Sequence, residues 1–189
     1  MANEISRLLS ALPLMLAFVA AAIPGPVAAG QDTRIVSYEV TAEGPLKVTY
    51  SDGAVVKIPK ERGRFTRGDE VLTQESFKDI HVADDRRHIG WLADYMMCPQ
   101  SYPCSMALVI FQAGASPRYI SPEYGIPWKW RFQNGGKEIV MHSGFTHGDA
   151  DGIYTLWDTD SGPARARYAP GEGSPPAWVQ DFLAQEKAR

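Results

Sequence analysis

Hydrophobic and polar residues alternate along most of the chain after about residue 30. Between residues 128 and 133, aromatic residues stand at every second position and polar residues stand between them. A period of two predicts a strand with one buried and one solvated face. Asn134-Gly135-Gly136 follows and suits a tight hairpin, because these residues tolerate positive φ. Three more short strands are expected, which completes a four-stranded meander, at residues 137–142, 153–157 and 165–168.

A second copy of this unit precedes it. A shift of 50 positions places Val82 on Phe132, Ile89 on Ile139, and Trp91 on Met141. The two repeats span residues 77–120 and 128–168. Four strands in a period of roughly 40–50 residues are typical of propeller blades. We therefore predict an all-β fold of about two to three four-stranded antiparallel blades, an incomplete propeller, with a β-sandwich as the alternative.

The start of the folded region repeats the hairpin theme less regularly. Val36, Tyr38 and Val40 alternate with polar residues, and a second alternating run leads into the Asp-Gly turn at residues 52–53. Such a turn between two alternating runs is a strong hairpin signal. Residues 59–76 are charged and contain glycine, so we interpret them as a linker with little regular structure.

The C-terminus predicts a short helix over residues 174–187. Ser174 is a suitable N-cap and Pro175 suits the first helical position. The apolar residues that follow lie on one helix face. A helix this short needs to dock on the sheets to be stable.

The first 29 residues have the pattern of a secretory signal peptide. A basic residue is followed by an almost wholly apolar run, then by a Pro-Gly-Pro break and the small residues of Val27-Ala28-Ala29. The apolar run is short for a membrane-spanning helix. We expect cleavage after Ala29 or Gly30, no stable membrane span afterwards, and a periplasmic or secreted protein of bacterial type. The remaining residues, 30–189, make one domain.

Charge and composition limit the classes of partner that the protein is expected to bind. The formal net charge is −3, and acidic and basic residues are interspersed. There is no basic stripe of the kind that binds nucleic acid. With 14 prolines and 17 glycines, the chain suits an all-β domain with many turns.

The two cysteines, Cys98 and Cys104, lie in the short segment CPQSYPC. In an oxidising compartment an even number of cysteines favours a disulfide. The alternative is half of a zinc site, but no second pair of ligands has suitable spacing nearby. The disulfide would close the loop between the two hairpins of the first repeat.

One segment contains a cluster of chemically active side chains. Between residues 142 and 152 it carries two imidazoles and two carboxylates, from His142, His147, Asp149 and Asp151. Together they offer nitrogen and oxygen ligands for a metal. Aspartate and glycine also suit a turn, and we favour the turn over the metal site. No other motif indicates a cofactor, and we expect none.

The remaining histidines and tryptophans have structural interpretations. His81 and His88 lie on predicted strands, where we expect them to pack or to face water. The tryptophans of the repeats are at core positions.

The two longest loops of the repeats, residues 96–105 and 142–152, occupy equivalent places and should lie on one rim of the molecule. Binding residues concentrate in loops on rigid scaffolds. Tyr102, Phe145 and His147 are therefore our candidate binding residues, since aromatic residues on a rim suit a protein interface.

Five segments together resemble a group of exported proteobacterial proteins of unknown function, namely DDRRHIGWLADY, CPQSYPC, SMALVIF, PWKWRFQNGGKEIVMHSGFTHG and YTLWDTDSG. YTLWDTDSG is similar, more loosely, to the end of a WD-repeat propeller blade. The first resemblance covers residues 77–168 and implies no activity, and the second implies fold only. A closed propeller needs at least four blades, so a homodimer that completes the ring is one alternative.

The interpretation that follows is a non-catalytic binding or protein-interaction module, such as an inhibitor or an immunity protein, with another cell-envelope protein as partner. One alternative is a metal-dependent enzyme that uses the loop from His142 to Asp151. A structural component of the cell envelope is the other.

Overall fold

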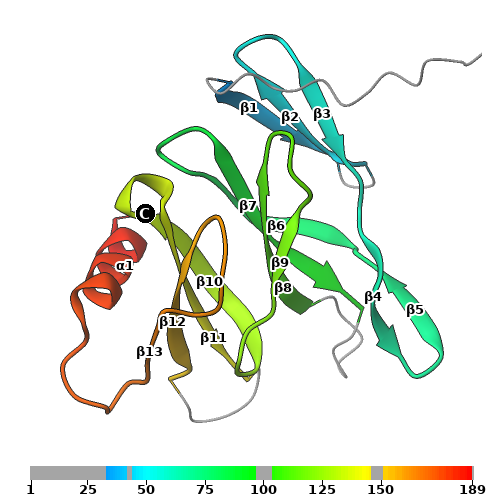
Figure 1. Ribbon diagram of the computed structural model, residues 1–189. Helices are drawn as coiled ribbons and strands as arrows, with labels where there is room; N and C mark the ends of the chain where they lie inside the picture. The colour runs from blue at the N-terminus through cyan, green and yellow to red at the C-terminus, as the bar shows by residue number, and fades with distance from the viewer. Residues whose placement is uncertain (1–32, 42–43, 97–103, 146–150, 189) are drawn as a thin grey trace, which may run out of the picture.

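The structure is a computed structural model that describes residues 33–41, 44–96, 104–145 and 151–188. It is an all-β protein with one short α-helix (Figure 1). The first two sheets comprise β1 (Ile35–Val40), β2 (Leu46–Tyr50), β3 (Val55–Ile58), β4 (Arg62–Arg67) and β5 (Glu70–Thr73). The next comprises β6 (Ser76–Val82), β7 (His88–Tyr95), β8 (Cys104–Gln112) and β9 (Arg118–Ile120). The last elements are β10 (Ile126–Gln133), the 3-10 turn η1 (Asn134–Gly136), β11 (Glu138–Gly144), β12 (Ile153–Asp158), β13 (Ala166–Tyr168) and α1 (Ala177–Lys187).

The strands form four antiparallel sheets. Sheet A has the order β1-β2-β3, sheet B is the hairpin β4-β5, sheet C has the order β6-β7-β8-β9, and sheet D has the order β10-β11-β12-β13. Sheets C and D are four-stranded meanders in which each strand pairs with the next one along the chain. They lie in the segments predicted as repeats, residues 77–120 and 128–168, and the predicted all-β fold with a short C-terminal helix is confirmed.

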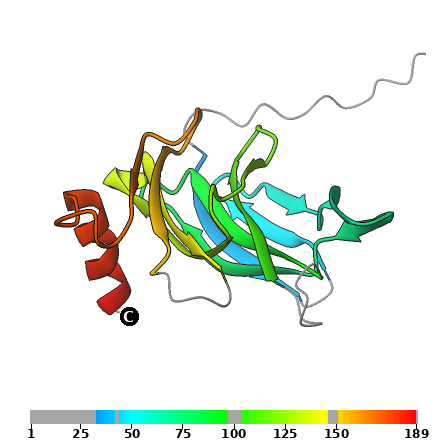
Figure 2. The ribbon, with the colours of Figure 1, turned by 90° about the horizontal axis from the view of Figure 1, so that it is seen from below.

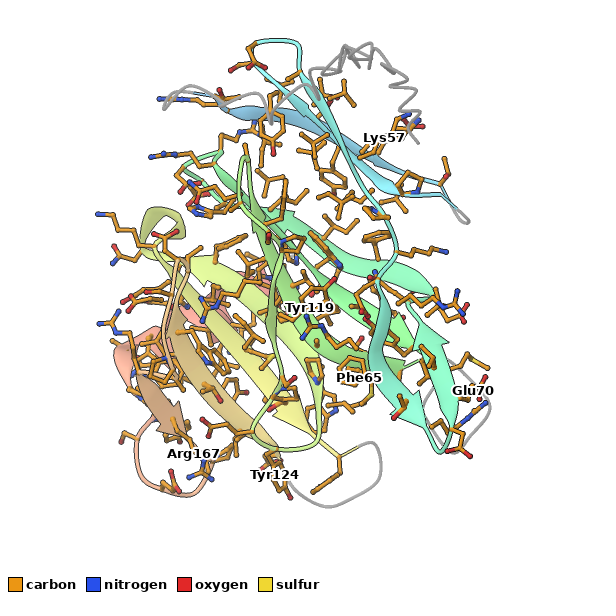
Figure 3. All side chains as sticks on the ribbon, turned by 45° about the vertical axis from the view of Figure 1, so that its right-hand side comes forward. Lys57, Phe65, Glu70, Tyr119, Tyr124 and Arg167 are labelled. Carbon is orange, nitrogen blue, oxygen red and sulfur yellow. The ribbon has the colours of Figure 1, made fainter. Side chains whose placement is uncertain are left out.

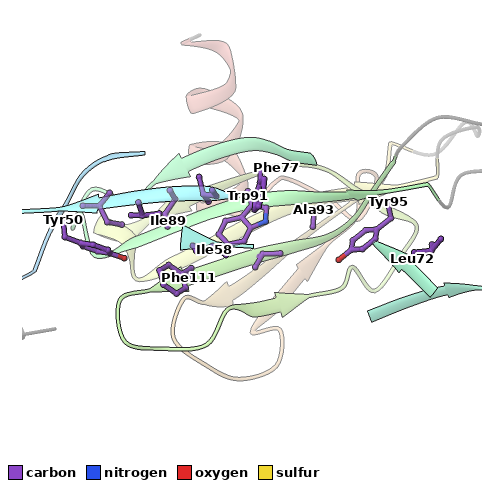
Figure 4. Packing of buried hydrophobic residues seen from close by; sticks show 13 residues of the cluster. Tyr50, Ile58, Leu72, Phe77, Ile89, Trp91, Ala93, Tyr95 and Phe111 are labelled. Atoms are coloured by element: carbon purple, nitrogen blue, oxygen red, sulfur yellow. The ribbon is translucent and has the colours of Figure 1, made fainter. Parts of the chain in front are cut away.

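Three sheets and the helix are stacked in layers (Figure 2). Sheet A packs on one face of sheet C through a cluster that includes Val48, Tyr50, Trp91 and Phe111 (Figure 4). The opposite face of sheet C packs on sheet D, and the far face of sheet D is covered by α1. Alternation along each strand makes this possible, because successive side chains of a central sheet point into different layers.

The two repeats keep the same register. Trp91 in sheet C faces sheet A, and Met141 in sheet D faces sheet C, so each points toward the preceding sheet. Val82 and Phe132 also pack toward the preceding sheet. A slip of one residue would have turned these side chains to opposite faces. The predicted alignment of the repeats is therefore confirmed.

Sheet A differs from the expected burial pattern. Val36, Tyr38 and Val40 are 54%, 44% and 36% exposed, although their alternation predicted a buried face. They lie on β1, which is an edge strand, and a β-bulge interrupts its pairing with β2 between Ile35 and Ser37. Alternation shows which face of a strand a residue lies on, but the neighbouring layer decides whether that face is covered.

The predicted linker at residues 59–76 is wrong, because most of it forms the hairpin β4–β5 and β6 already begins at Ser76. Phe65 lies edge-on against Tyr95 with ring centroids 4.8 Å apart. The guanidinium of Arg64 lies 3.8 Å from the ring centroid of Tyr119, in cation–π geometry. The hairpin could not be recognised from its own residues, which are mostly charged, because its stabilising contacts are with aromatic residues of sheet C.

The helix begins later than predicted. α1 starts at Ala177 with Pro176 in the N-cap position and no side-chain cap, so neither Ser174 nor Pro175 has its expected place. Val179 and Phe182 are its buried residues and pack on sheet D. Within the described residues, no helix has the length and apolar character needed to cross a membrane.

Candidate functional site

The end of sheet D where β11 stops and β12 begins carries an exposed aromatic pair. Phe145 follows β11 and is 55% exposed. Its ring lies 4.5 Å from the ring of Tyr124, edge to face, and Tyr124 precedes β10 at the same end of the sheet (Figure 3). We name this end, formed by Tyr124, Phe145 and Asp151, the loop rim.

Directly beneath the loop rim, three aromatic rings form a layer. His142 stacks on Tyr154 with centroids 4.2 Å apart and an interplanar angle of 3°. The indole of Trp128 meets the imidazole edge-on at 4.9 Å. A Cβ atom on Gly144 would lie 2.3 Å from that indole, so only glycine fits beneath it. These contacts give the loop rim a rigid base.

His142 is committed to this base. Its Nε2 lies 2.7 Å from the backbone oxygen of Asp151 and donates to it in the neutral tautomer that carries the proton there. Burial lowers the pKa of His142, and the positive charge of Lys129 acts in the same direction, while the hydrogen bond to Asp151 opposes both. The neutral imidazole ties the end of β11 to the start of β12.

The structure tests the sequence-predicted site residues only in part. Of that set, it brings Phe145 and Asp151 to the loop rim and His142 to the aromatic layer beneath it. Among the described residues, no group of three or more His, Cys, Asp or Glu side chains is arranged to hold a metal ion. The other predicted residues lie outside the described part of the chain, namely Cys98, Tyr102, His147 and Asp149.

The predicted disulfide also involves a residue outside the described ranges. Cys104 is the first residue of β8 and is buried. It lies at the same end of sheet C at which β7 stops. Its pairing with Cys98 stays a prediction.

A network of charged side chains, which the sequence did not reveal, joins sheets C and D to α1. The carboxylate of Asp79 on β6 lies 2.8 Å from His81 Nε2 and 3.1 Å from Arg131 Nη1. Arg131 on β10 also pairs with Glu186 on α1, and Glu186 accepts from Lys129 Nζ at 2.9 Å. The Arg131 side chain is only 9% exposed. The network is therefore a largely buried link between three elements that are distant in sequence.

The backbone at Asp79 is unusual and contributes to this network. Asp79 has a positive φ of 47° and lies in the bulge of β6 between Lys78 and His81. The bulge turns its carbonyl toward the indole of Trp130, which donates to it at 2.9 Å. A non-glycine residue in this conformation costs of order 1 kcal/mol or more, and the contacts of Asp79 offset that cost.

The charges decide what this network can do. A cleft of about 320 Å³ lies beside it, bordered by His81, Asp84 and Arg131. Arg131 is already neutralised by Asp79 and Glu186, so its charge is not available to attract an anion. Burial raises the pKa of Asp79, but the hydrogen bonds and charges of His81 and Arg131 outweigh burial and hold it below the usual range. The network is best interpreted as a clamp that fixes α1.

The sequence-based interpretation of the two strand histidines is also refined. His81 belongs to the clamp. His88 is buried between two carboxylates, those of Asp85 and Asp160, at the end of the sheets opposite the loop rim. Neither arrangement was visible in the sequence, because Asp160 is 72 positions from His88.

Comparison with known proteins adds no relative. No family model, no curated protein and no solved structure matches the chain. The site is therefore interpreted from its own geometry.

Proposed function

We propose that this protein is a non-catalytic binding module that engages another protein of the cell envelope through the loop rim. The observation that carries the proposal is the exposed ring of Phe145, which Tyr124 holds edge-on above a rigid aromatic base. A fixed aromatic side chain loses little conformational entropy on binding, and such residues are enriched at the centres of protein interfaces.

Binding is favoured over catalysis by the arrangement of the described donors. Of the candidate metal ligands that are described, His142 uses its Nε2 in the hydrogen bond to the Asp151 carbonyl, and its ring stacks on Tyr154 and meets Trp128 edge-on. These contacts suit a structural residue. Phe145, in contrast, presents apolar surface to solvent.

Site-specific photocrosslinking tests the proposal. A photoreactive phenylalanine analogue replaces Phe145 in the cells that normally produce the protein. The matched control carries the same analogue at Val55, which is 53% exposed on the distant sheet A. We expect one crosslinked product of defined mass at position 145 and none at position 55. The mature N-terminus, measured on the same product, reports whether the leader has been removed.

A second experiment separates binding from folding. Phe145→Ala should abolish the complex and leave the melting temperature within about 2 °C of the original, because an exposed side chain contributes little to stability. Equal crosslinking at positions 145 and 55 would contradict the proposal. So would a complex that survives Phe145→Ala.

A further inference from the structure

At the end of sheets C and D opposite the loop rim, His88 is held between two carboxylates. Its Nδ1 lies 2.9 Å from Asp85 Oδ2, and its Nε2 lies 3.0 Å from Asp160 Oδ1. The His88 side chain is 9% exposed. A neutral imidazole carries one N–H donor, so both hydrogen bonds form together only when His88 is protonated.

The two carboxylates are held very differently. Asp85 also accepts a hydrogen bond from the backbone N–H of Arg87 at 2.8 Å, and its side chain is 26% exposed. The Asp160 side chain is 75% exposed. Among the described residues, the carboxylate of Asp160 makes its hydrogen bond only with His88. Asp85 is therefore a fixed partner that orients the imidazole, whereas Asp160 is free to rotate away.

The turn that carries Asp160 is itself well anchored. Arg118 on β9 donates to the backbone carbonyls of Asp158 at 2.7 Å, Thr159 at 3.0 Å and Gly162 at 2.9 Å. Rotation of the Asp160 side chain thus requires no movement of the backbone. The cationic group of Arg118 remains beside the place that the carboxylate would leave.

Cationic groups surround this place. A cleft of about 390 Å³ is bordered by Arg87, His88, Lys137 and Asp160, together with Asp85 and Gln112. Arg87 and Lys137 are exposed. When Asp160 turns away, the positive charges around His88 are those of Arg87, Lys137 and Arg118. The negative charges are those of Asp85 and of Asp158, which lies beside Arg118. The cleft then carries a positive excess next to a buried N–H donor.

We propose that this cleft binds a single oxyanion group, of the carboxylate, sulfate or phosphate type, and that Asp160 occupies its place when no ligand is bound. An incoming oxyanion would accept from His88 Nε2 and lie between Arg87 and Lys137. Hydrogen bonds from charged donors to oxyanions are the stronger class. The site lies at the opposite end of sheet D from the loop rim, so it is independent of the proposed function.

The alternative is that Asp160–His88 only ties the turn of sheet D to sheet C. The two roles differ in what happens when Asp160 loses its charge. If the Asp160 carboxylate competes with an external oxyanion, removing its charge makes the oxyanion bind more tightly. If it only links the two sheets, removing its charge leaves oxyanion binding unaffected.

The test is an NMR titration of the intact protein labelled with ¹⁵N-histidine, with sulfate as the probe because its charge is constant across the histidine range. We expect a saturable shift of the His88 Nε2 signal as sulfate is added. Asp160→Asn should tighten sulfate binding by roughly twofold to fivefold. Acetate as a second probe distinguishes planar carboxylates from tetrahedral anions.

Matched variants in one turn provide the control. Arg87→Gln should weaken sulfate binding by roughly threefold. Arg86→Gln removes the same charge from the neighbouring position, which does not border the cleft, and should have no effect. Equal effects of the two variants would overturn the proposal, because they would indicate general screening. Absence of a saturable shift in both the original protein and Asp160→Asn would also overturn it.

Discussion

At the scale of single residues, Gly90 sets how closely sheets C and D approach. It lies on β7, and a Cβ atom added there would be 2.5 Å from Cη2 of Trp130 and 2.7 Å from Cδ1 of Ile110. Both neighbours belong to the core between the two sheets. The absence of a side chain at this position is what admits the indole.

Gly90→Ala is therefore expected to destabilise the fold by about 1–3 kcal/mol, the usual cost of overpacking a core. Gly114→Ala is the comparison, since Gly114 has open space around it and a positive φ of 80°. That substitution should cost only about 1 kcal/mol, from backbone conformation alone. Denaturant unfolding of both variants measures the difference. An equal loss in the two would contradict the close contact with Trp130.

Asp79 makes the free energy of unfolding depend on pH in the acidic range. Because the folded pKa of Asp79 is held below its usual value of 3.8, its contribution is complete above that value. The contribution is lost as the pH falls through the lower folded value. We expect Asp79→Asn to be less stable than the original protein at neutral pH and to have a flatter stability profile below about pH 4. Unfolding free energies measured from neutral to acidic pH test this. Parallel profiles would contradict it.

At the scale of elements, sheets C and D could be predicted because local information specifies them. Alternating runs separated by Asn-Gly-Gly and Asp-rich turns determine strand, turn and facing side within each hairpin. The hairpin β4–β5 could not be predicted, because its stabilising contacts come from Tyr95 and Tyr119 in another sheet. His88 and Asp160 were missed for the same reason, since their contact depends on how the two sheets pack.

The helix depends on tertiary contacts more than on its own sequence. It lacks a side-chain cap and has 11 residues, too few for stability alone. Phe182 is 1% exposed and lies 5.6 Å from Tyr154, centroid to centroid.

Phe182→Ala should cost about 3–5 kcal/mol, as expected for a large buried aromatic residue. Asp181→Ala, at the neighbouring exposed position, should change stability by less than about 0.5 kcal/mol. Thermal or denaturant unfolding distinguishes the two variants. A loss under about 1 kcal/mol for Phe182→Ala would show that α1 is not docked on sheet D.

At the scale of the whole molecule, neither outer face of the stack of sheets that the structure describes presents a large apolar surface. The far face of sheet D is covered by α1. The outer face of sheet A is mainly polar, because Glu39, Lys47 and Lys57 are paired across its three strands. Lys47 Nζ also forms an ion pair with Glu39 at 3.3 Å. A sheet face that packs against a further blade would be apolar instead.

This pattern bears on ring completion by a second copy. Packing a further sheet on sheet A would bury Glu39, Lys47 and Lys57, and burying charged groups without new partners is unfavourable. We therefore expect the protein to be a monomer, which light scattering coupled to size exclusion measures directly. Glu39→Leu together with Lys47→Leu would make the face apolar and should promote concentration-dependent association. A stable dimer of the unmodified protein would contradict this interpretation. If Lys57→Glu disrupted that dimer, the outer face of sheet A would be identified as its interface.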